Sequence, residues 1–230
     1  MIVVPILKPG RQGHLPEDYR PIGLLSTLRK LFEKILQDRL SFHLERFHLW
    51  PRTQFGFRKG HGTAFPLYVF LTDVHIAFAT NRHVLALFLD LSAAYDHVCV
   101  QRLAERLLTL GIPPILCYLL SELYSHRQYS LPPSFRSTLT RYTSQGIIQG
   151  SSLSPLLYAL YVGDILSSVE VSARVLQYAD DIIIYTAISP RDPTDLGRFE
   201  RDCQCIITYL QALTCRLIFL RLDSCISSGI

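Results

Sequence analysis

Three aspartates interrupt segments that otherwise have the composition of buried strands. Asp90 ends the apolar run 84–90, and Asp180 and Asp181 lie inside the run 175–186. Burying one ionised carboxylate is costly, and a second one beside it raises the pKa further. Such groups need protonation, an arginine partner, exposure at a turn, or a divalent cation. Clustered carboxylates suit Mg²⁺, and two such ions about 4 Å apart can hold the attacking and leaving oxygens of phosphoryl transfer.

The elements that must position these aspartates follow from hydrophobic patterning. We expect 84–90 to form a buried strand, and 175–186 to form two short strands with the aspartates at the turn between them. A further β-ribbon is expected within 128–148. Apolar spacing predicts helices over 28–47 (capped by Ser26 or Thr27), 100–110, from 154 onward, and 195–213. Because helices and strands mix without a regular βαβ alternation, the predicted fold class is α+β, with helices on one face of an antiparallel sheet.

Composition excludes several classes of protein. The chain has 230 residues, of which 49% are apolar and 18% charged, with a net charge of +4. These values exclude a disordered tail and a collagen-like or low-complexity fibre, and the mild positive charge permits a nucleic-acid partner. No apolar run approaches the ~20 residues of a spanning helix, and the N-terminus does not resemble a signal peptide. We therefore expect an intracellular protein with no membrane partner, nuclear or cytoplasmic.

The cysteines and histidines offer no zinc pattern. None of the six cysteines belongs to a CxxC pair, and the eight histidines show no ligand spacing with one another. We expect reduced cysteines in the core and no zinc site.

Several short motifs accompany the aspartates. They are PILKPG at 5–10, YRPI at 19–22, QFGFR at 54–58, LFLDLSAAYDH at 87–97, GIIQGSSLSP at 146–155 and YADD at 178–181. In this order and at these spacings, the set resembles the reverse transcriptase domain of non-LTR (LINE-type) retrotransposons, from Val4 to about Tyr185.

The resemblance implies a right-hand polymerase architecture with an antiparallel palm sheet backed by helices. Residues 1–82 would be mainly fingers and 83–230 mainly palm, with a fingers-like insertion near 112–145. The implied activity is RNA-directed DNA polymerase, which adds deoxynucleotides to a primer 3′-hydroxyl with two Mg²⁺ ions, for which Mn²⁺ could substitute. The implied partners are an RNA template, a DNA primer and deoxynucleoside triphosphates.

The resemblance also assigns roles to the aspartates and to one tyrosine. Asp90, Asp180 and Asp181 would be the catalytic palm carboxylates that bind metal, with the backbone carbonyl of Leu91 completing the coordination shell. Tyr95 would pack under the sugar of the incoming nucleotide, where a ribose 2′-hydroxyl would collide with it.

Other residues receive roles in nucleotide and template binding. Gln149 and Gly150 would contact the incoming nucleotide, and Lys8 and Arg20 would lie over its triphosphate, since cationic side chains suit phosphate oxygens. Candidate template contacts, through charge or base stacking, are Arg58, Lys59 and Phe57.

The match has departures and leaves alternatives. Asp223 stands where the family has a lysine, which could serve as a general acid for pyrophosphate. No thumb or endonuclease segment is recognisable, so we expect a fragment. An RNA-dependent RNA polymerase shares the palm chemistry, but Tyr95 and Ala179 argue against it. The remaining alternative is a catalytically inactive, truncated retrotransposon remnant that at most binds RNA.

Overall fold

The chain folds into two compact units, each built from two separated stretches of sequence. The computed structural model describes residues 1–92, 94–133, 140–163, 165–168, 171–213 and 216–220. Unit 1 comprises Met1–Leu49 and Tyr95–Tyr158, and unit 2 comprises Trp50–Ala94 and Ala159–Ile230.

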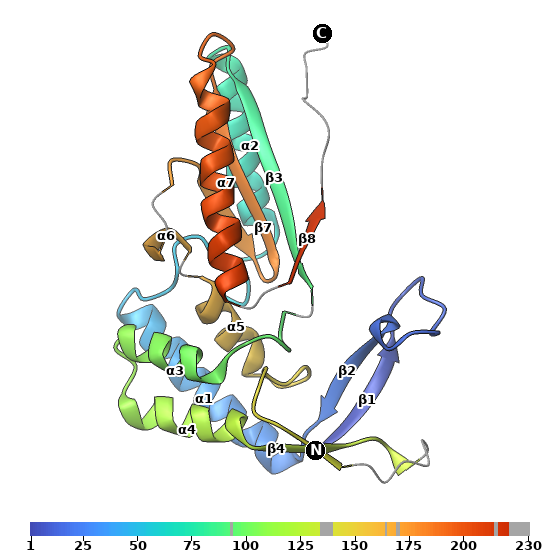
Figure 1. The fold of residues 1–230 in the computed structure, drawn as a ribbon. Helices are drawn as coiled ribbons and strands as arrows, with labels where there is room; N and C mark the ends of the chain where they lie inside the picture. Colours follow the sequence, from blue (N-terminus) through green and yellow to red (C-terminus); the bar gives the residue numbers. More distant parts are fainter. Residues whose placement is uncertain (93, 134–139, 164, 169–170, 214–215, 221–230) are drawn as a thin grey trace. The chain divides into compact units, whose positions relative to one another are not determined.

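Unit 1 contains a four-stranded sheet in the order β2-β1-β4-β5. Strands β1 (Ile2–Leu7) and β2 (Tyr19–Leu24) form an antiparallel hairpin, whose connection includes the short 3-10 helix η1 (Pro16–Asp18). Strands β4 (Arg127–Ser130) and β5 (Thr140–Thr143) form the antiparallel ribbon that was predicted within 128–148. The N-terminal hairpin is the blue pair of arrows in Figure 1.

Helices α1 (Thr27–Arg46), α3 (Val100–Thr109) and α4 (Pro114–Ser125) complete most of unit 1. Ser26 caps α1, because its hydroxyl accepts a hydrogen bond from the third helical N–H, and the predicted helix is confirmed. Helix α3 also matches its prediction, whereas α4 was not predicted. The two pack against each other (Figure 1).

The buried face of α1 is not wholly apolar. Leu36, Leu40 and Leu44 are buried, whereas Leu28 is 80% exposed. The fourth buried position is Glu33, which has no exposed surface. Apolar spacing alone cannot detect a buried carboxylate, because its place on the helix depends on polar partners elsewhere in the fold.

Unit 2 contains an antiparallel sheet in the order β6-β7-β3-β8. The strands are β6 (Arg174–Tyr178), β7 (Asp181–Ile188), β3 (His83–Ser92) and β8 (Arg216–Leu220). The predicted strands at 84–90 and 175–186, with the aspartates at the turn, are confirmed.

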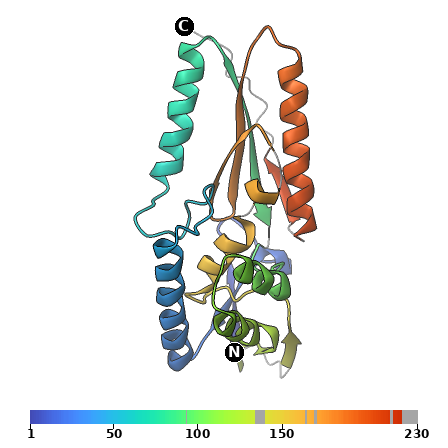
Figure 2. The ribbon, with the colours of Figure 1, turned by 90° about the vertical axis from the view of Figure 1, so that its left-hand side faces the viewer.

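Helices α2 (Ala64–Ala79) and α7 (Thr194–Ala212) cover opposite faces of this sheet (Figure 2). On the α2 side, the ring of Phe70 contacts Phe88 of β3 and Tyr185 of β7, with centroids 6.1 and 5.0 Å apart. The sheet is thus covered on both faces, rather than on one, because the strands are apolar on both sides.

Two shorter helices are α5 (Ser154–Val162), which begins as predicted, and α6 (Ile165–Ser168). Of the helices in the described part of the chain, none combines the length and the apolar character that crossing a membrane requires. The cysteines in the described part of the chain are reduced, namely Cys99, Cys117, Cys203 and Cys205.

Candidate active site

The pairing of β3 with β7 brings two of the three aspartates together. Asp90 lies directly opposite Asp181 in the antiparallel ladder. Residues opposite each other in such a ladder have Cα atoms about 4.5–5.5 Å apart and side chains on the same face of the sheet. The neighbouring Leu89 and Leu91 alternate to the other face, and each is only 2% exposed. The strand thus buries its leucines while keeping Asp90 half-buried beside Asp181.

The third aspartate lies in the turn that joins β6 to β7. Tyr178 and Asp181 are the last paired residues, so Ala179 and Asp180 form a two-residue loop. Ala179 has a φ of +59°, a left-handed conformation that costs an L-residue free energy and is usually occupied by glycine at this place in a hairpin. The loop therefore places Asp180 next to the Asp90–Asp181 pair.

The carboxylates of Asp90, Asp180 and Asp181 crowd negative charge at this turn. Burial raises the pKa of the Asp181 carboxyl, and the charges of Asp180 and Asp90 raise it further. Carboxylate oxygens are the donors that Mg²⁺ prefers, and a bound cation would remove the repulsion among the three groups. These carboxylates are therefore the type of donor that a hard divalent cation prefers. In the described part of the chain, no three His, Cys, Asp or Glu side chains are already arranged around a common metal position.

Unit 1 gathers several of the predicted nucleotide-binding residues. The Gln149 side-chain amide donates to both carboxylate oxygens of Asp96, at 3.4 and 3.3 Å. Burial raises the pKa of Asp96, while the Gln149 hydrogen bond opposes that shift. The ring of Tyr95 stacks on that of buried Tyr158, with centroids 5.2 Å apart and planes at 22°. Both Tyr95 and Gln149 are thus oriented by residues of unit 1.

Gly150 has a packing reason to be glycine. Its φ is +102°, a conformation that other residues rarely adopt. A Cβ atom there would lie 3.0 Å from the carbonyl oxygen of Gly23 in β2. The N–H of Gly23 donates to the Gln149 carbonyl at 2.7 Å, so this loop is attached to the hairpin.

Lys8 and Arg20 both belong to the β1–β2 hairpin. Lys8 follows β1, and its N–H donates to the Asp18 carbonyl at 2.8 Å. Its positive charge is the smallest of the influences that oppose the burial-raised pKa of Asp96. Arg20 lies opposite Ile6 in the hairpin and is exposed.

The candidate template contacts lie in unit 2, between Gly56 and α2. Phe57 is 43% exposed and has a φ of +63°. The Arg58 guanidinium lies 5.8 Å from the centroid of Trp50, in cation–π geometry. Lys59 is exposed. Part of Arg58 is thus committed to packing on Trp50.

The buried polar side chains without a predicted role include Arg127 and Gln54. Arg127 is 6% exposed and donates to the carbonyls of Tyr124, Gly146 and Gln145, so it supports the loop before Gln149. Gln54 is 1% exposed and hydrogen-bonds to the aspartate turn. Gln54 belongs to a recognised motif, whereas a buried Arg127 leaves no signal in the sequence.

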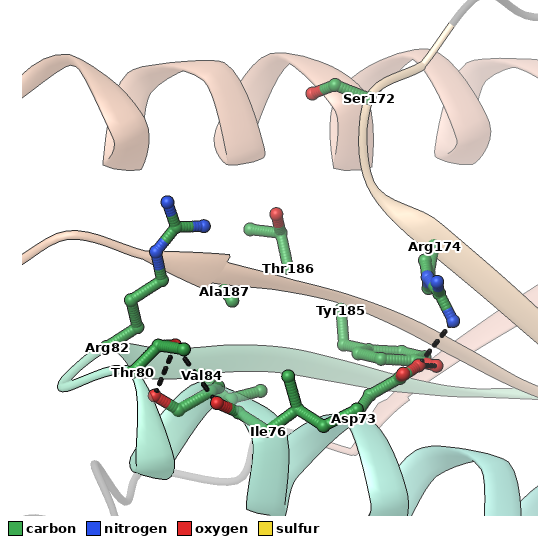
Figure 3. A pocket seen from close by; sticks show the side chains of 11 residues that line it. Asp73, Ile76, Thr80, Arg82, Val84, Ser172, Arg174, Tyr185, Thr186 and Ala187 are labelled. Atoms are coloured by element: carbon green, nitrogen blue, oxygen red, sulfur yellow. Dashed lines mark hydrogen bonds and ion pairs between the residues drawn. The ribbon is translucent and has the colours of Figure 1, made fainter.

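A surface hollow of about 290 Å³ lies along α2 and the sheet of unit 2, and Asp90, Asp180 and Asp181 do not line it (Figure 3). On one side of it, Asp73 accepts hydrogen bonds from the Tyr185 hydroxyl and from Arg174, both at 2.6 Å. None of the predicted site residues lines it. Asp223 lies outside the described residues.

The fold and the motifs define a class of protein. The family described as reverse transcriptase (RNA-dependent DNA polymerase) matches residues 6–217, and the chain belongs to this family. Solved telomerase structures from Candida tropicalis have the same fold. One apo structure has a TM-score of 0.63 at 12% identity, covering 96% of this chain and 47% of the other.

The matching sequences come from mobile elements. The chain is 32% identical over 195 residues to a probable RNA-directed DNA polymerase from transposon BS of Drosophila melanogaster, covering 79% of this chain and 21% of that protein. It is 30% identical over 190 residues to the RNA-directed DNA polymerase from mobile element jockey of Drosophila funebris, covering 80% and 21%. The chain thus spans about a fifth of these relatives. The resemblance to non-LTR retrotransposon reverse transcriptases is confirmed.

Proposed function

We propose that this chain acts as an RNA-directed DNA polymerase that adds deoxynucleotides to a primer 3′-hydroxyl on an RNA template. The observation that carries the proposal is the register of β3 against β7, which sets Asp90 opposite Asp181 with Asp180 in the adjoining turn. Membership of the reverse transcriptase family supports it. In this proposal, the sheet of unit 2 belongs to the palm. The division into fingers over 1–82 and palm over 83–230 stays a prediction.

Asp90, Asp180 and Asp181 would hold two Mg²⁺ ions, or Mn²⁺ in their place, with the Leu91 carbonyl as a further ligand. When bound, such ions supply charge stabilisation for the attacking and leaving oxygens of phosphoryl transfer. The contribution of the protein is to position the three carboxylates. The antiparallel ladder fixes the direction of Asp90 and Asp181, and the two-residue loop restricts Asp180, so little reorganisation is needed during the reaction.

The nucleotide-binding roles are proposed for residues of unit 1. Gln149 would donate a hydrogen bond to the incoming deoxynucleotide, with Gly150 allowing the close backbone packing of its loop. Tyr95, braced by Tyr158, would lie under the sugar and exclude a 2′-hydroxyl. The cationic side chains of Lys8 and Arg20 would bind the triphosphate, because they pair well with phosphate oxygens.

Template and primer binding completes the proposal. Phe57, Arg58 and Lys59 would contact the RNA template by stacking and by charge. The telomerase from Candida tropicalis was solved in complex with a fragment of telomeric RNA, and it shares the fold of this chain at 14% identity. The RNA-binding role proposed here rests on the family and on the exposed side chains of Phe57 and Lys59, with Arg58 half-buried between them.

The test is primer extension on an RNA template with deoxynucleotides and Mg²⁺, using the full chain. Asp180→Asn should abolish extension, whereas Asp38→Asn, which removes an exposed carboxylate of α1, should leave it unchanged. Equal extension by the wild type and Asp180→Asn would reject the assignment. RNA binding without extension by any variant would favour the inactive remnant.

A further inference from the structure

A short segment before α2 runs alongside the end of β6. The N–H of Gln177 donates to the Thr53 carbonyl at 2.7 Å, and the N–H of Phe55 donates to the Gln177 carbonyl at 2.9 Å. The Thr53 hydroxyl also donates to Oε1 of Gln177 at 2.7 Å. These bonds form a parallel bridge directly before the aspartate turn. The segment is therefore attached to the strand that leads into the site.

The side chain of Gln54 reaches from this segment to the turn itself. Its Oε1 accepts hydrogen bonds from the N–H of Gly56 at 2.8 Å and from the N–H of Ala179 at 3.0 Å. Its Nε2 donates to the Ala179 carbonyl at 3.2 Å. One buried amide thus satisfies both the backbone donor and the backbone acceptor of the residue that precedes Asp180.

The neighbouring glycine permits this close approach. A Cβ atom on Gly56 would lie 2.4 Å from the backbone nitrogen of Ala179 and 3.1 Å from its Cα atom. Ala179 itself is held at a φ of +59°, which an alanine does not favour. The contacts of Gln54 and Gly56 fall on the one residue of the turn whose backbone conformation is unfavourable, so they counteract its tendency to relax.

We propose that Gln54 is a positioning residue for the metal-binding turn. By hydrogen-bonding both backbone groups of Ala179, it keeps the left-handed conformation that sets the direction of the Asp180 and Asp181 carboxylates. The inference deepens the proposed function and rests on it. If Gln54 only filled space in the core, its removal would lower stability without affecting the turn selectively.

The first measurement follows the turn without any metal. Residue-resolved amide exchange should show the Ala179 N–H protected in the wild-type chain and exchanging at least about tenfold faster in Gln54→Ala. Tyr185→Phe is the matched control, because it removes a side-chain hydrogen bond to Asp73 in the same unit without affecting the turn. Unchanged exchange at Ala179 in Gln54→Ala would overturn the proposal.

The second measurement uses Mn²⁺ alone, titrated and detected by electron paramagnetic resonance. Groups that orient metal ligands typically contribute 10–100-fold in affinity, so Gln54→Ala should weaken Mn²⁺ binding by about tenfold or more. Adding Ala179→Gly to Gln54→Ala should recover at least threefold, because glycine adopts the turn conformation readily. A purely structural role would give no such recovery.

The outcomes separate this inference from the proposed function. Equal Mn²⁺ affinity in the wild type and Asp181→Asn would reject the metal site, and the positioning role would fall with it. Weaker binding in Asp181→Asn with unchanged binding in Gln54→Ala would leave the metal site standing and overturn the role of Gln54 alone. Tyr185→Phe should bind Mn²⁺ as the wild type does.

Discussion

The side-chain amide of Gln149 donates to the carboxylate of Asp96, which lies 53 residues earlier in the chain. Because the carboxylate has no donor of its own when ionised, the pair leaves the second amide hydrogen and the carbonyl oxygen of Gln149 available to a ligand. The contact therefore orients the residue that we propose to contact the incoming nucleotide.

Asp96→Ala should raise the KM for deoxynucleotides by about three- to tenfold, which corresponds to the roughly 0.7–1.4 kcal/mol of one ordinary hydrogen bond. The change in kcat should be smaller, since Asp96 acts through Gln149. Steady-state primer extension checks this, with Asp38→Ala as a control for loss of an exposed carboxylate. An unchanged KM in Asp96→Ala would contradict the orienting role.

Asp181→Asn should stabilise the metal-free protein at pH 7. The pKa of Asp181 is raised in the folded state. The protonated carboxyl therefore contributes its full stabilisation below the ordinary carboxyl pKa, and this stabilisation is lost as pH rises through the folded pKa. Asparagine removes this loss, and the gain in Tm should be at most about 2 °C because solvent screens the exposed side chain. Thermal unfolding in chelator from pH 3.5 to 8 measures it. A lower Tm for the variant than for the wild type at pH 7 would contradict the predicted stabilisation.

Glu33→Ala should cost about 3 kcal/mol in the free energy of unfolding. Glu33 is fully buried, and it accepts hydrogen bonds from Arg29 at 3.0 Å and from Ser151 at 2.7 Å, each of which would lose this acceptor. The matched control is Lys34→Ala, which breaks an exposed pair on the same helix and should cost under about 0.5 kcal/mol. Equal losses of unfolding free energy in the two variants, measured by urea unfolding, would show that the buried network stabilises the fold no more than the exposed pair does.

Tyr95→Val should relax sugar discrimination. Shortening the side chain opens the space that a ribose 2′-hydroxyl would need, so ribonucleotide incorporation relative to deoxynucleotide should rise at least about tenfold, or 1.4 kcal/mol of discrimination. Competitive extension with the two nucleotide types measures the ratio. An unchanged ratio with intact activity would remove Tyr95 from the sugar site.

The sequence indicated the aspartate-bearing strands because apolar residues dominate both runs, and the adjacent Asp180 and Asp181 inside the second run predict a turn. The helices 28–47 and 195–213 were equally visible through their periodicity. Helix α2 was not, because residues 64–79 are apolar on nearly every side and include Pro66, which weakens any helical pattern.

The polar supports of the site were harder to predict. Gln54 bonds to a turn 125 residues away, and Arg127 bonds to carbonyls of a loop about 18 residues away. Burial of a polar side chain depends on partners that only the folded chain supplies. The sequence therefore indicates candidate residues for chemical roles more readily than the residues that hold them in place.

The interleaving of the two units sets an order on their synthesis. Every segment of unit 1 has been synthesised once residue 158 is made. Strand β3 must then wait, because its two neighbours in the sheet, β7 and β8, begin only at residues 181 and 216. During that interval an apolar strand has unpaired edges, a state prone to aggregation, so nascent chains stalled before residue 181 should depend on chaperones more than released ones.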